Sequence, residues 1–332
     1  MTVLVTGGAG YIGSHMVHEL VDAGEKVVVL DSLATGFDWA VAEGVPLIVG
    51  DTGDQPLVAS IIAEHGVDAI IHFAASTVVP ESVAQPLAYY RNNTVNSRAL
   101  IETAIQGGVK HFIFSSTAAV YGNPERSPVA EDAPTMPMSP YGASKLMTER
   151  MLRDAGYAHG LGYVVLRYFN VAGADPKLRT GQSTPNATHL IKVACEAALG
   201  KRGKLQIFGT DYPTPDGTCV RDYIHVTDLV RAHLASLAYL RRGGVSATFN
   251  CGYGRGYSVL QVVEAVRRAN RHDFPVEISG RRPGDPASIV ADVLRIRSAL
   301  DWRPQFEDLD TIVSHALAWE RRLPGKKESV SA

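Results

Sequence analysis

A glycine-rich segment close to the N-terminus constrains the fold of this chain more than any other feature. The segment, Gly7-Gly-Ala-Gly-Tyr-Ile-Gly13, lies between an apolar run at residues 2–6 and a stretch with helical apolar spacing at residues 12–23. Glycines let a backbone turn tightly and approach a pyrophosphate, and the free N–H groups at the start of the following helix stabilise its charge. The order strand, glycine turn, helix therefore predicts a dinucleotide site at the first crossover of a βαβ unit.

An acidic residue after the second apolar run supports this interpretation, because glycine turns also end many strands that bind nothing. Asp31 follows Gly13 by 18 residues, directly after the run at residues 26–30. A carboxylate at this point accepts hydrogen bonds from a ribose diol and repels a 2′-phosphate, which favours NAD over NADP. The alternative for Asp31 is an acid of a strand-end turn. Asp51, after the third run, is either an adenine contact or a turn residue.

The first half of the chain alternates short runs rich in Val, Ile and Phe with stretches of three- and four-residue apolar spacing. We expect strands at residues 2–6, 26–30, 46–49, 68–73, 110–115 and 163–168. We expect helices at residues 12–23, 56–65, 87–106 and 141–157. Parallel neighbours need crossover helices on both faces of a sheet, so the pattern predicts an α/β fold with a doubly wound parallel sheet.

The pattern changes after Tyr168. Loops rich in Gly, Pro, Asp and Thr are expected at residues 173–185 and 209–217, helices at 189–198 and 227–241, and strands at 247–251 and 276–278. We therefore expect a Rossmann domain for NAD at residues 1–170, to which part of residues 220–255 returns. Residues 171–330 would form a smaller mixed α/β substrate domain.

Composition excludes several classes of protein. Lys and Arg number 32 and Asp and Glu 34, so the formal net charge of −2 offers no field for a nucleic acid. No apolar run approaches the roughly 18 residues of a membrane helix, and the start of the chain lacks the pattern of a signal peptide. The 3 cysteines are scattered, and no His, Asp or Glu cluster has metal-ligand spacing. We expect a cytoplasmic protein without a metal.

A tyrosine and a lysine one helical turn apart point to chemistry. Tyr141 and Lys145 follow Pro140, which favours a helix start, and they then share one face of that helix. A free phenol has a pKa near about 10, and a nearby ammonium favours the phenolate and lowers that pKa. Lys145 can also bind the nicotinamide ribose, and residues 115–117, Ser-Ser-Thr, supply hydroxyls. The alternative is an exposed pair on a surface helix.

Several motifs resemble those of a known family. Thr6-Gly-Gly-Ala-Gly-Tyr-Ile-Gly-Ser14, His72-Phe-Ala-Ala75, Ser115-Ser-Thr-Ala-Ala-Val-Tyr-Gly122 and Tyr141-x-x-x-Lys145 resemble the extended short-chain dehydrogenase/reductases. More specific stretches resemble the UDP-glucose 4-epimerases of that family: Arg167-Tyr-Phe-Asn170, Phe208-Gly-Thr-Asp-Tyr-Pro-Thr-Pro-Asp-Gly-Thr218 and Val220-Arg-Asp-Tyr-Ile-His-Val226. The likeness runs from residue 1 to about residue 320, and is closest to bacterial enzymes that supply sugar nucleotides for exopolysaccharide.

The resemblance implies an isomerase that holds NAD tightly and inverts C4 of a hexose on UDP. UDP-glucose and UDP-galactose would interconvert through a 4-keto sugar, a reaction of galactose metabolism. By the same resemblance Tyr141 takes the proton of the 4-hydroxyl, Lys145 supports it, and Thr117 binds the same oxygen. A 4,6-dehydratase is disfavoured, because the residues after Thr117 are Ala118 and Ala119 and not an acid pair.

The resemblance also implies two sets of binding residues. Contacts to NAD would come from Gly7, Gly10, Tyr11, Ile12, Gly13, Asp31, Asp51, Thr52, Phe73, Ala74, Ala75, Asn92, Ser115, Tyr141, Lys145 and Phe169. Contacts to the UDP-sugar would come from Thr117, Tyr141, Asn170, His189, Leu190, Gln206, Phe208, Arg221, Arg282 and Asp285. Among the latter, the arginines and Asn170 would bind the diphosphate, the phenylalanine would lie beside the uracil, and the aspartate would hold the ribose. The alternatives are a surface ion pair for each arginine and core packing for the phenylalanine.

Some questions stay open at this stage. Thr77 stands where some family members carry a lysine near the pyrophosphate, and Ile289 occupies a pocket-wall position that bears on N-acetyl sugars. Other UDP-sugars therefore remain as substrates: UDP-xylose or UDP-arabinose, UDP-glucuronate and UDP-N-acetylhexosamines. A non-catalytic NAD-binding regulator is the alternative from a different class. A homodimer is expected through residues 87–106 and 141–157, whose apolar faces would otherwise be internal.

Overall fold

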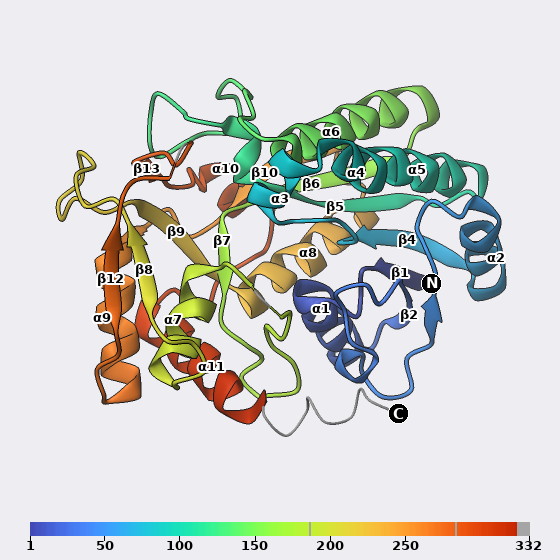
Figure 1. The fold of residues 1–332 in the computed structure, drawn as a ribbon. Coiled ribbons are helices and arrows are strands. Elements are labelled where there is room, and N and C mark those ends of the chain that lie inside the picture. The colour runs from blue at the N-terminus through green and yellow to red at the C-terminus, as the bar shows by residue number, and fades with distance from the viewer. Residues whose placement is uncertain (186, 283, 324–332) are drawn as a thin grey trace.

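In the computed structural model, which describes residues 1–185, 187–282 and 284–323, a seven-stranded parallel sheet forms the larger lobe (Figure 1). Its strand order is β10-β6-β5-β4-β1-β2-β3, and every pairing is parallel. The strands are β1 (Thr2–Thr6), β2 (Lys26–Asp31), β3 (Leu47–Val49), β4 (Val67–His72), β5 (His111–Thr117), β6 (Gly162–Tyr168) and β10 (Ala247–Cys251). The predicted doubly wound sheet is confirmed.

Helices cover both faces of this sheet. Figure 1 shows α1 (Tyr11–Asp22) and α8 (Val226–Arg241) on one face, and α5 (Asn96–Gln106) and α6 (Pro140–His159) on the other. Each face of the sheet has its own hydrophobic core, and successive residues of β1 point into opposite cores. Val3 packs on the side of α1, and Leu4 packs on the side of α5 and α2 (Gln55–His65). Because both faces are buried, the strands read as continuous apolar runs in the sequence.

The helix expected at residues 87–106 is present, but it contains a π-helical turn that the sequence pattern did not indicate. The segment consists of α4 (Pro86–Tyr89), a π-helical turn η2 (Tyr90–Val95) and α5, and the short α3 (Val79–Ala84) precedes it. The turn contains Asn93, whose side chain binds the backbone N–H and carbonyl of Ser76. A π-helical turn adds one residue to the helix, but the apolar spacing before and after it stays helical. The sequence pattern therefore gives no signal of the turn.

The smaller lobe holds two further sheets. One joins β7 (Asn170–Ala172), β9 (Val220–His225), β11 (Gly256–Ser258) and β13 (Ser288–Ile289), and the other pairs β8 (Leu205–Phe208) with β12 (Val276–Ser279). Its helices are α7 (Leu190–Ala198), α9 (Val259–Asn270), α10 (Leu294–Ala299) and α11 (Leu309–Arg322). In the larger lobe, short 3-10 helices follow two strands: η1 (Asp38–Ala40) comes after β2, and η3 (Ala118–Tyr121) comes after β5.

The sequence analysis missed three of these helices, α9, α10 and α11. A readable signal existed for α9, because Ser258 and Gln261 form a capping box at its start. The two long loops at residues 173–185 and 209–217 contain no helix or named strand among the residues described there, as expected.

The chain returns to the large sheet after entering the smaller lobe. β10 pairs with β6, and α8 packs against α1. Asp228, in the first turn of α8, accepts hydrogen bonds from the Tyr253 hydroxyl and from the backbone N–H groups of Gln305 and Phe306. The lobes are thereby held together around the C-terminal ends of the parallel strands, where α/β sheets bind ligands.

No helix within the described residues has the length and apolar character to cross a membrane. Nor do those residues hold a group of three or more His, Cys, Asp or Glu side chains placed to bind a metal ion.

Candidate active site

The glycine turn forms a backbone cradle that only glycine can occupy. Gly7 has φ +71°, and a Cβ on it would lie 2.6 Å from the backbone nitrogen of Ala74. A Cβ on Gly13 would lie 2.0 Å from the carbonyl oxygen of Gly7. The N-cap residue of α1 is Gly10, which has no side chain to bind the first N–H groups of the helix. The first N–H groups of α1 are therefore not capped by a side chain, which is the arrangement that binds anions at helix N-termini.

Asp31 lies at the end of β2, beside this cradle. Its Oδ2 accepts a hydrogen bond from the N–H of Ala9 at 2.9 Å, and its Oδ1 one from the N–H of Leu33 at 2.8 Å. Leu33 has φ +56°, a left-handed conformation that is strained for a residue with a Cβ. The carboxylate is thus fixed between the glycine turn and the next loop. Sequence reasoning missed Leu33, since nothing in a leucine's identity indicates positive φ.

Two further candidates for cofactor contact, Asp51 and Asn92, are connected through one asparagine. The amide of Asn96 donates to Asp51 Oδ1 at 2.8 Å and to Asn92 Oδ1 at 3.4 Å. Asn92 in turn donates to the hydroxyl of Ser76, and the buried Thr52 follows Asp51. Asp51 also accepts from a backbone N–H within its own turn. Asn96 was missed, although it lies one helical turn from Asn92.

The C-terminal end of β4 lies directly below the glycine turn. The N–H groups of Phe73 and Ala74 both donate to the carbonyl of Thr6, at 3.0 and 3.1 Å. Ala75 and Phe169 are half-buried and buried, respectively. Thr77, which stands where some family members carry a lysine, is exposed.

Tyr141, Lys145 and Thr117 come together at the ends of α6 and β5. The side chain of Ser139 caps α6 by accepting from the N–H of Gly142, which places Tyr141 in the first turn. Tyr141 is 7% exposed and Lys145 2% exposed. The Lys145 ammonium donates to the carbonyl oxygen of Ser115 at 3.0 Å, and Tyr141 forms a hydrogen bond with Thr117. The predicted pair is therefore internal and not a surface pair.

Burial dominates the electrostatics of this pair. It raises the pKa of Tyr141 to about 12, and the hydrogen bond with Thr117 acts in the opposite direction. Burial lowers the pKa of Lys145 to about 7, and the Glu149 carboxylate opposes this decrease. The sequence expectation that Lys145 would lower the pKa of Tyr141 below its ordinary value is wrong here. The reason is that removing both groups from water disfavours the phenolate and the ammonium alike.

A histidine from the second half of the chain reaches the same site. His233 on α8 bonds through Nδ1 to the carbonyl of Leu229, so Nδ1 carries the proton and Nε2 accepts from the hydroxyl of Ser115 at 2.8 Å. Burial lowers the pKa of His233 to about 4, which keeps the ring neutral. The same ring packs on Phe73, with centroids 4.8 Å apart. Sequence reasoning missed His233, because Ser115, its partner in this site, is 118 residues away along the chain.

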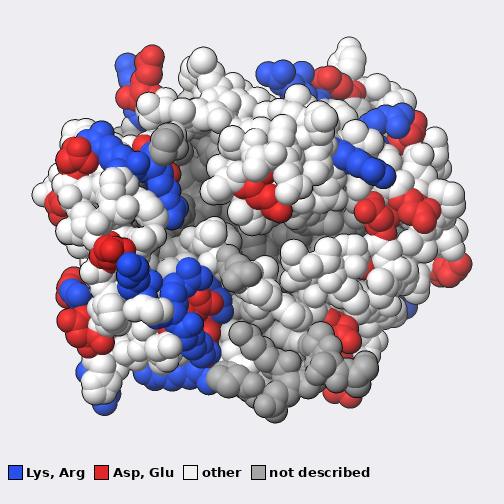
Figure 2. Space-filling view, viewed as in Figure 1, with Lys and Arg blue, Asp and Glu red and all other residues white. Residues whose placement is uncertain are grey.

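Four candidates for substrate contact form two pairs in the smaller lobe. The Arg282 guanidinium lies over the ring of Phe208, 3.6 Å from its centroid. Arg221 Nη2 lies 3.7 Å from Asp285 Oδ1. Figure 2 shows that this face of the molecule is hollowed between the lobes and that basic side chains gather on the rim over the smaller lobe. Such a rim suits a diphosphate.

Other candidates lie on neighbouring elements of the smaller lobe. Asn170 begins β7, and Leu190 begins α7 directly after the N-cap residue His189. Gln206 is exposed on β8, on the same strand face as Phe208, and its amide donates to Glu277 Oε2 at 3.1 Å. The Gln206 side chain thus also contacts the neighbouring strand of its own small sheet.

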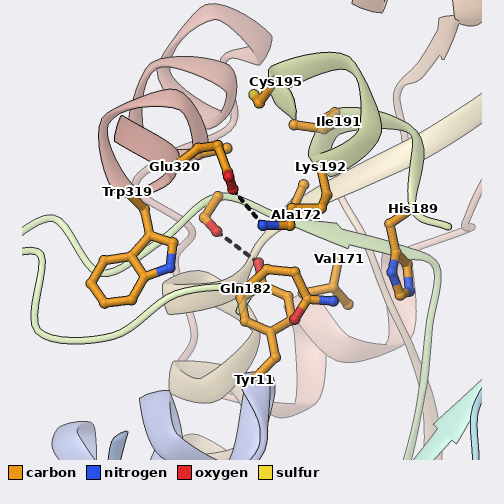
Figure 3. Close-up of a pocket in the computed structure, with 12 residues that line it drawn as sticks. Tyr11, Val171, Ala172, Gln182, His189, Ile191, Lys192, Cys195, Trp319 and Glu320 are labelled. Atoms are coloured by element: carbon orange, nitrogen blue, oxygen red, sulfur yellow. Dashed lines mark hydrogen bonds and ion pairs between the residues drawn. The ribbon is translucent and has the colours of Figure 1, made fainter. Parts of the chain in front are cut away.

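A small cavity lies behind β7. Tyr11, His189, Lys192 and Glu320 are among its lining residues, and its volume is about 20 Å³ (Figure 3). The hydroxyl of Tyr11 donates to the carbonyl of Gly173 at 2.8 Å, and Lys192 forms an ion pair with Glu320. About one water molecule needs this much space, so the cavity does not hold a sugar nucleotide.

Comparisons with known proteins were made for the whole chain. Residues 3–252 match the model of the NAD dependent epimerase/dehydratase family. A UDP-glucose 4-epimerase of Azospirillum brasilense is 60% identical over 321 residues, which cover 97% of this chain and 92% of the relative.

Two solved structures show the same fold. The Brucella ovis UDP-glucose 4-epimerase in complex with NAD matches with a TM-score of 0.93 at 42% identity, covering 96% of this chain and 97% of that one. The enzyme of that name from Stenotrophomonas maltophila, with bound NAD and formylated UDP-arabinopyranose, matches with a TM-score of 0.95 at 39% identity, covering 98% and 99%.

Proposed function

Since the chain belongs to the NAD dependent epimerase/dehydratase family, we propose that it is an isomerase that interconverts UDP-glucose and UDP-galactose. The observation that carries this proposal is the buried cluster of Tyr141, Lys145 and Thr117 beside a glycine cradle. A binding protein would not need a buried phenol hydrogen-bonded to a hydroxyl at the C-terminal end of the sheet. The non-catalytic regulator is therefore not favoured.

The residues present fit NAD. The absence of a Cβ at Gly7 and Gly13 lets the glycine turn pack directly on neighbouring backbone, the close approach that a pyrophosphate-binding turn requires. The Asp31 carboxylate lies beside it and favours a ribose diol over a 2′-phosphate. We propose that the loop after β2, the turn at Asp51 and the end of β4 complete the adenosine side, while Ser115, Lys145 and the aromatic neighbours meet the nicotinamide side. When bound, NAD supplies a hydride acceptor and donor at C4 of the sugar.

The chain's own residues handle the proton at the C4 oxygen. Tyr141 as phenolate accepts this proton and later returns it, and Thr117 holds the same oxygen by its hydroxyl. The ammonium of Lys145 favours the phenolate electrostatically. Their burial limits the access of bulk water to the reacting groups, which disfavours side reactions of the 4-keto sugar.

The smaller lobe would hold the nucleotide part of the substrate. We propose that Arg221 and Arg282 bind the diphosphate, Phe208 stacks on the uracil, and Asp285 binds the ribose. Arg282 covers the Phe208 ring in this structure, so the guanidinium would move aside as the uracil enters. Asn170, His189, Leu190 and Gln206 are proposed as further contacts to the sugar and diphosphate.

The direct test of this function uses the purified protein without added cofactor. We expect about one NAD per chain in the supernatant after denaturation, because the catalytic cycle regenerates the cofactor and needs it to stay bound. Incubation with UDP-glucose, followed by chromatographic separation of the C4 epimers, is expected to yield UDP-galactose. No nucleotide in the supernatant, or no C4 epimer, would contradict the proposal.

A second group of substrates has a specific observation in its favour. The relative from Stenotrophomonas maltophila carries a formylated UDP-arabinopyranose, which is a UDP-pentose. In this chain Ile289 is buried on β13, opposite Arg221 on β9, where it would line the sugar pocket. Adding UDP-xylose, UDP-glucuronate and UDP-N-acetylglucosamine to the assay above ranks these sugars by kcat/KM.

We also propose a homodimer, supported by an apolar surface on one side of the large sheet. A groove of about 440 Å³ runs between α5 and α6, with Ile101, Ile105 and Met151 among its lining residues. Val95, in the π-helical turn that precedes α5, and Met147, on α6, are both exposed. We expect light scattering to give twice the chain mass for the wild type, and the chain mass for the double variant Val95→Glu/Met147→Glu. If the double variant still has twice the chain mass, the dimer interface does not lie at this groove.

A cytoplasmic place and a supply of sugar nucleotides for exopolysaccharide are the remaining parts of the proposal. They are supported by the resemblance of the motifs to bacterial epimerases with that role. Cell fractionation tests the first part, and the galactose content of the surface polysaccharide in a strain lacking the protein tests the second.

A further inference from the structure

A third ionisable residue lies on the same face of α6 as the catalytic pair. Glu149 follows Lys145 by four residues, as Lys145 follows Tyr141. Residues at this spacing are neighbours on a helix surface, with Cβ atoms about 5–6 Å apart. Glu149 is buried like the other two. A buried carboxylate needs a reason, because taking it out of water is costly unless it is paired.

Glu149 is held by two strands of the large sheet. Arg167 on β6 donates to it from Nε at 3.1 Å and from Nη2 at 2.6 Å, and the two side chains are 9% and 6% exposed. The hydroxyl of Ser116 donates to the same carboxylate. Ser116 and Arg167 are partners in the register of β5 and β6. The carboxylate therefore has one position and its donors come from the sheet beneath.

The arginine of this pair is anchored in turn. Its Nη1 donates to the Tyr121 hydroxyl at 3.0 Å and to the Glu131 carbonyl at 3.1 Å, and its guanidinium lies 5.0 Å from the Tyr121 ring centroid. Each of the three guanidinium nitrogens of Arg167 thus donates to at least one acceptor. Arg167, itself a residue of β6, therefore holds the Glu149 carboxylate in place as an anion.

The electrostatic consequence falls on Lys145. Burial lowers the pKa of Lys145 to about 7, and Glu149 is the group that opposes this. From β4, His72 faces the lysine as a neutral ring, since burial and then Lys145 lower its pKa to about 3. Tyr141, whose pKa burial raises, is the remaining neighbour on the helix. Without Glu149 an uncharged amine would be favoured at neutral pH.

We propose that Glu149, as the anion of the Glu149–Arg167 pair, is a positioning residue that keeps Lys145 protonated beside Tyr141 at neutral pH. The inference rests on the proposed epimerase activity, in which the ammonium favours the Tyr141 phenolate. It assigns a role in the reaction to an ion pair that lies outside the proposed contacts to substrate and cofactor. A purely structural pair would influence stability and leave the titration of Lys145 alone.

Three variants separate these two roles. E149Q removes the charge but leaves the Arg167 guanidinium buried and unpaired, which endangers folding. E149Q/R167M removes both charges and restores an uncharged interior of similar volume, so it is expected to fold. E149D keeps the charge on a shorter side chain. The matched control is E320Q, which breaks another buried ion pair, with Lys192.

Two readouts are measured on the purified holoenzyme. One is the pH profile of kcat, and the other is an NMR titration of lysines labelled with ¹³C at Cε, with Lys145 assigned by its loss in K145M. In E149Q/R167M we expect the pKa of Lys145 and the alkaline limb of kcat to move about one pH unit toward acid. At pH 8 kcat should fall roughly tenfold with KM within about twofold. In E149D, which keeps the negative charge, the alkaline limb of kcat should lie close to its wild-type position.

The outcomes are distinguishable. E320Q should lower the melting temperature and leave both titrations in place. A folded E149Q/R167M with the wild-type Lys145 titration and pH profile would overturn the inference. If the wild type fails to turn over any UDP-sugar, the proposed function fails. The NMR titration still decides whether Glu149 controls the charge of Lys145.

Discussion

Tyr141→Phe is expected to reduce kcat for UDP-glucose by about 10²–10⁴-fold, the range that general acid–base catalysis contributes. The phenol is the group that would accept and return the proton at the C4 oxygen, and phenylalanine has no proton to move. The variant should keep its fold, because the ring fills the same buried space and only the hydrogen bond with Thr117 is lost. It should also keep its NAD, since the glycine cradle is untouched.

The same helix offers a matched control for this variant. Tyr157 lies on α6 and is 95% exposed. Tyr157→Phe also removes one phenol hydroxyl from α6, but from its exposed surface, and is expected to leave kcat at the wild-type value. Steady-state rates, melting temperatures and released NAD should be measured for both. Wild-type turnover in Tyr141→Phe would show that another group handles the proton.

Gly7→Ala is expected to yield a protein that purifies without NAD and unfolds at a lower temperature. A methyl group at this position would collide with the backbone of Ala74. Backbone cannot rotate away as a side chain can, so either β4 or the glycine turn must shift. The N–H groups at the start of α1 would then no longer face a common point, and the pyrophosphate site would be lost.

A second glycine separates this collision from simple backbone strain. Gly24 has φ +77°, close to that of Gly7, and a Cβ on it would meet no atom within 4 Å. Gly24→Ala therefore carries only the strain of a left-handed residue, about 1–2 kcal/mol. We expect it to lose a few degrees of melting temperature and to retain NAD. Equal NAD content in both variants would refute the cradle as the cofactor site.

The local features of the site were predictable from sequence. The glycine turn follows a strand and opens a helix, and such a unit can be recognised from residues next to one another. Tyr141 and Lys145 share a helix face for the same reason, since four residues make about one turn. These relations need no knowledge of the rest of the chain. The family match and the parallel sheet confirm the NAD dependent epimerase/dehydratase family and the fold class, whereas the roles of Tyr141 and Lys145 stay predictions.

Other features depended on contacts across the fold. The π-helical turn before α5 inserts a residue without disturbing the apolar period, so the pattern indicated one helix. His233 and Arg167 reach the site from strands and helices whose order in space the local pattern does not specify. The pKa of Tyr141 was expected below its ordinary value, and burial raises it instead.

The sequence by itself determined the fold class, the cofactor cradle and the tyrosine–lysine pair. Each depends on spacing along one strand or one helix, which is a local property of the chain. Only the tertiary structure decided the charge of the lysine and the environment of the phenol. Those depend on how completely other segments exclude water and on which buried charges they bring near, and no local pattern carries that information.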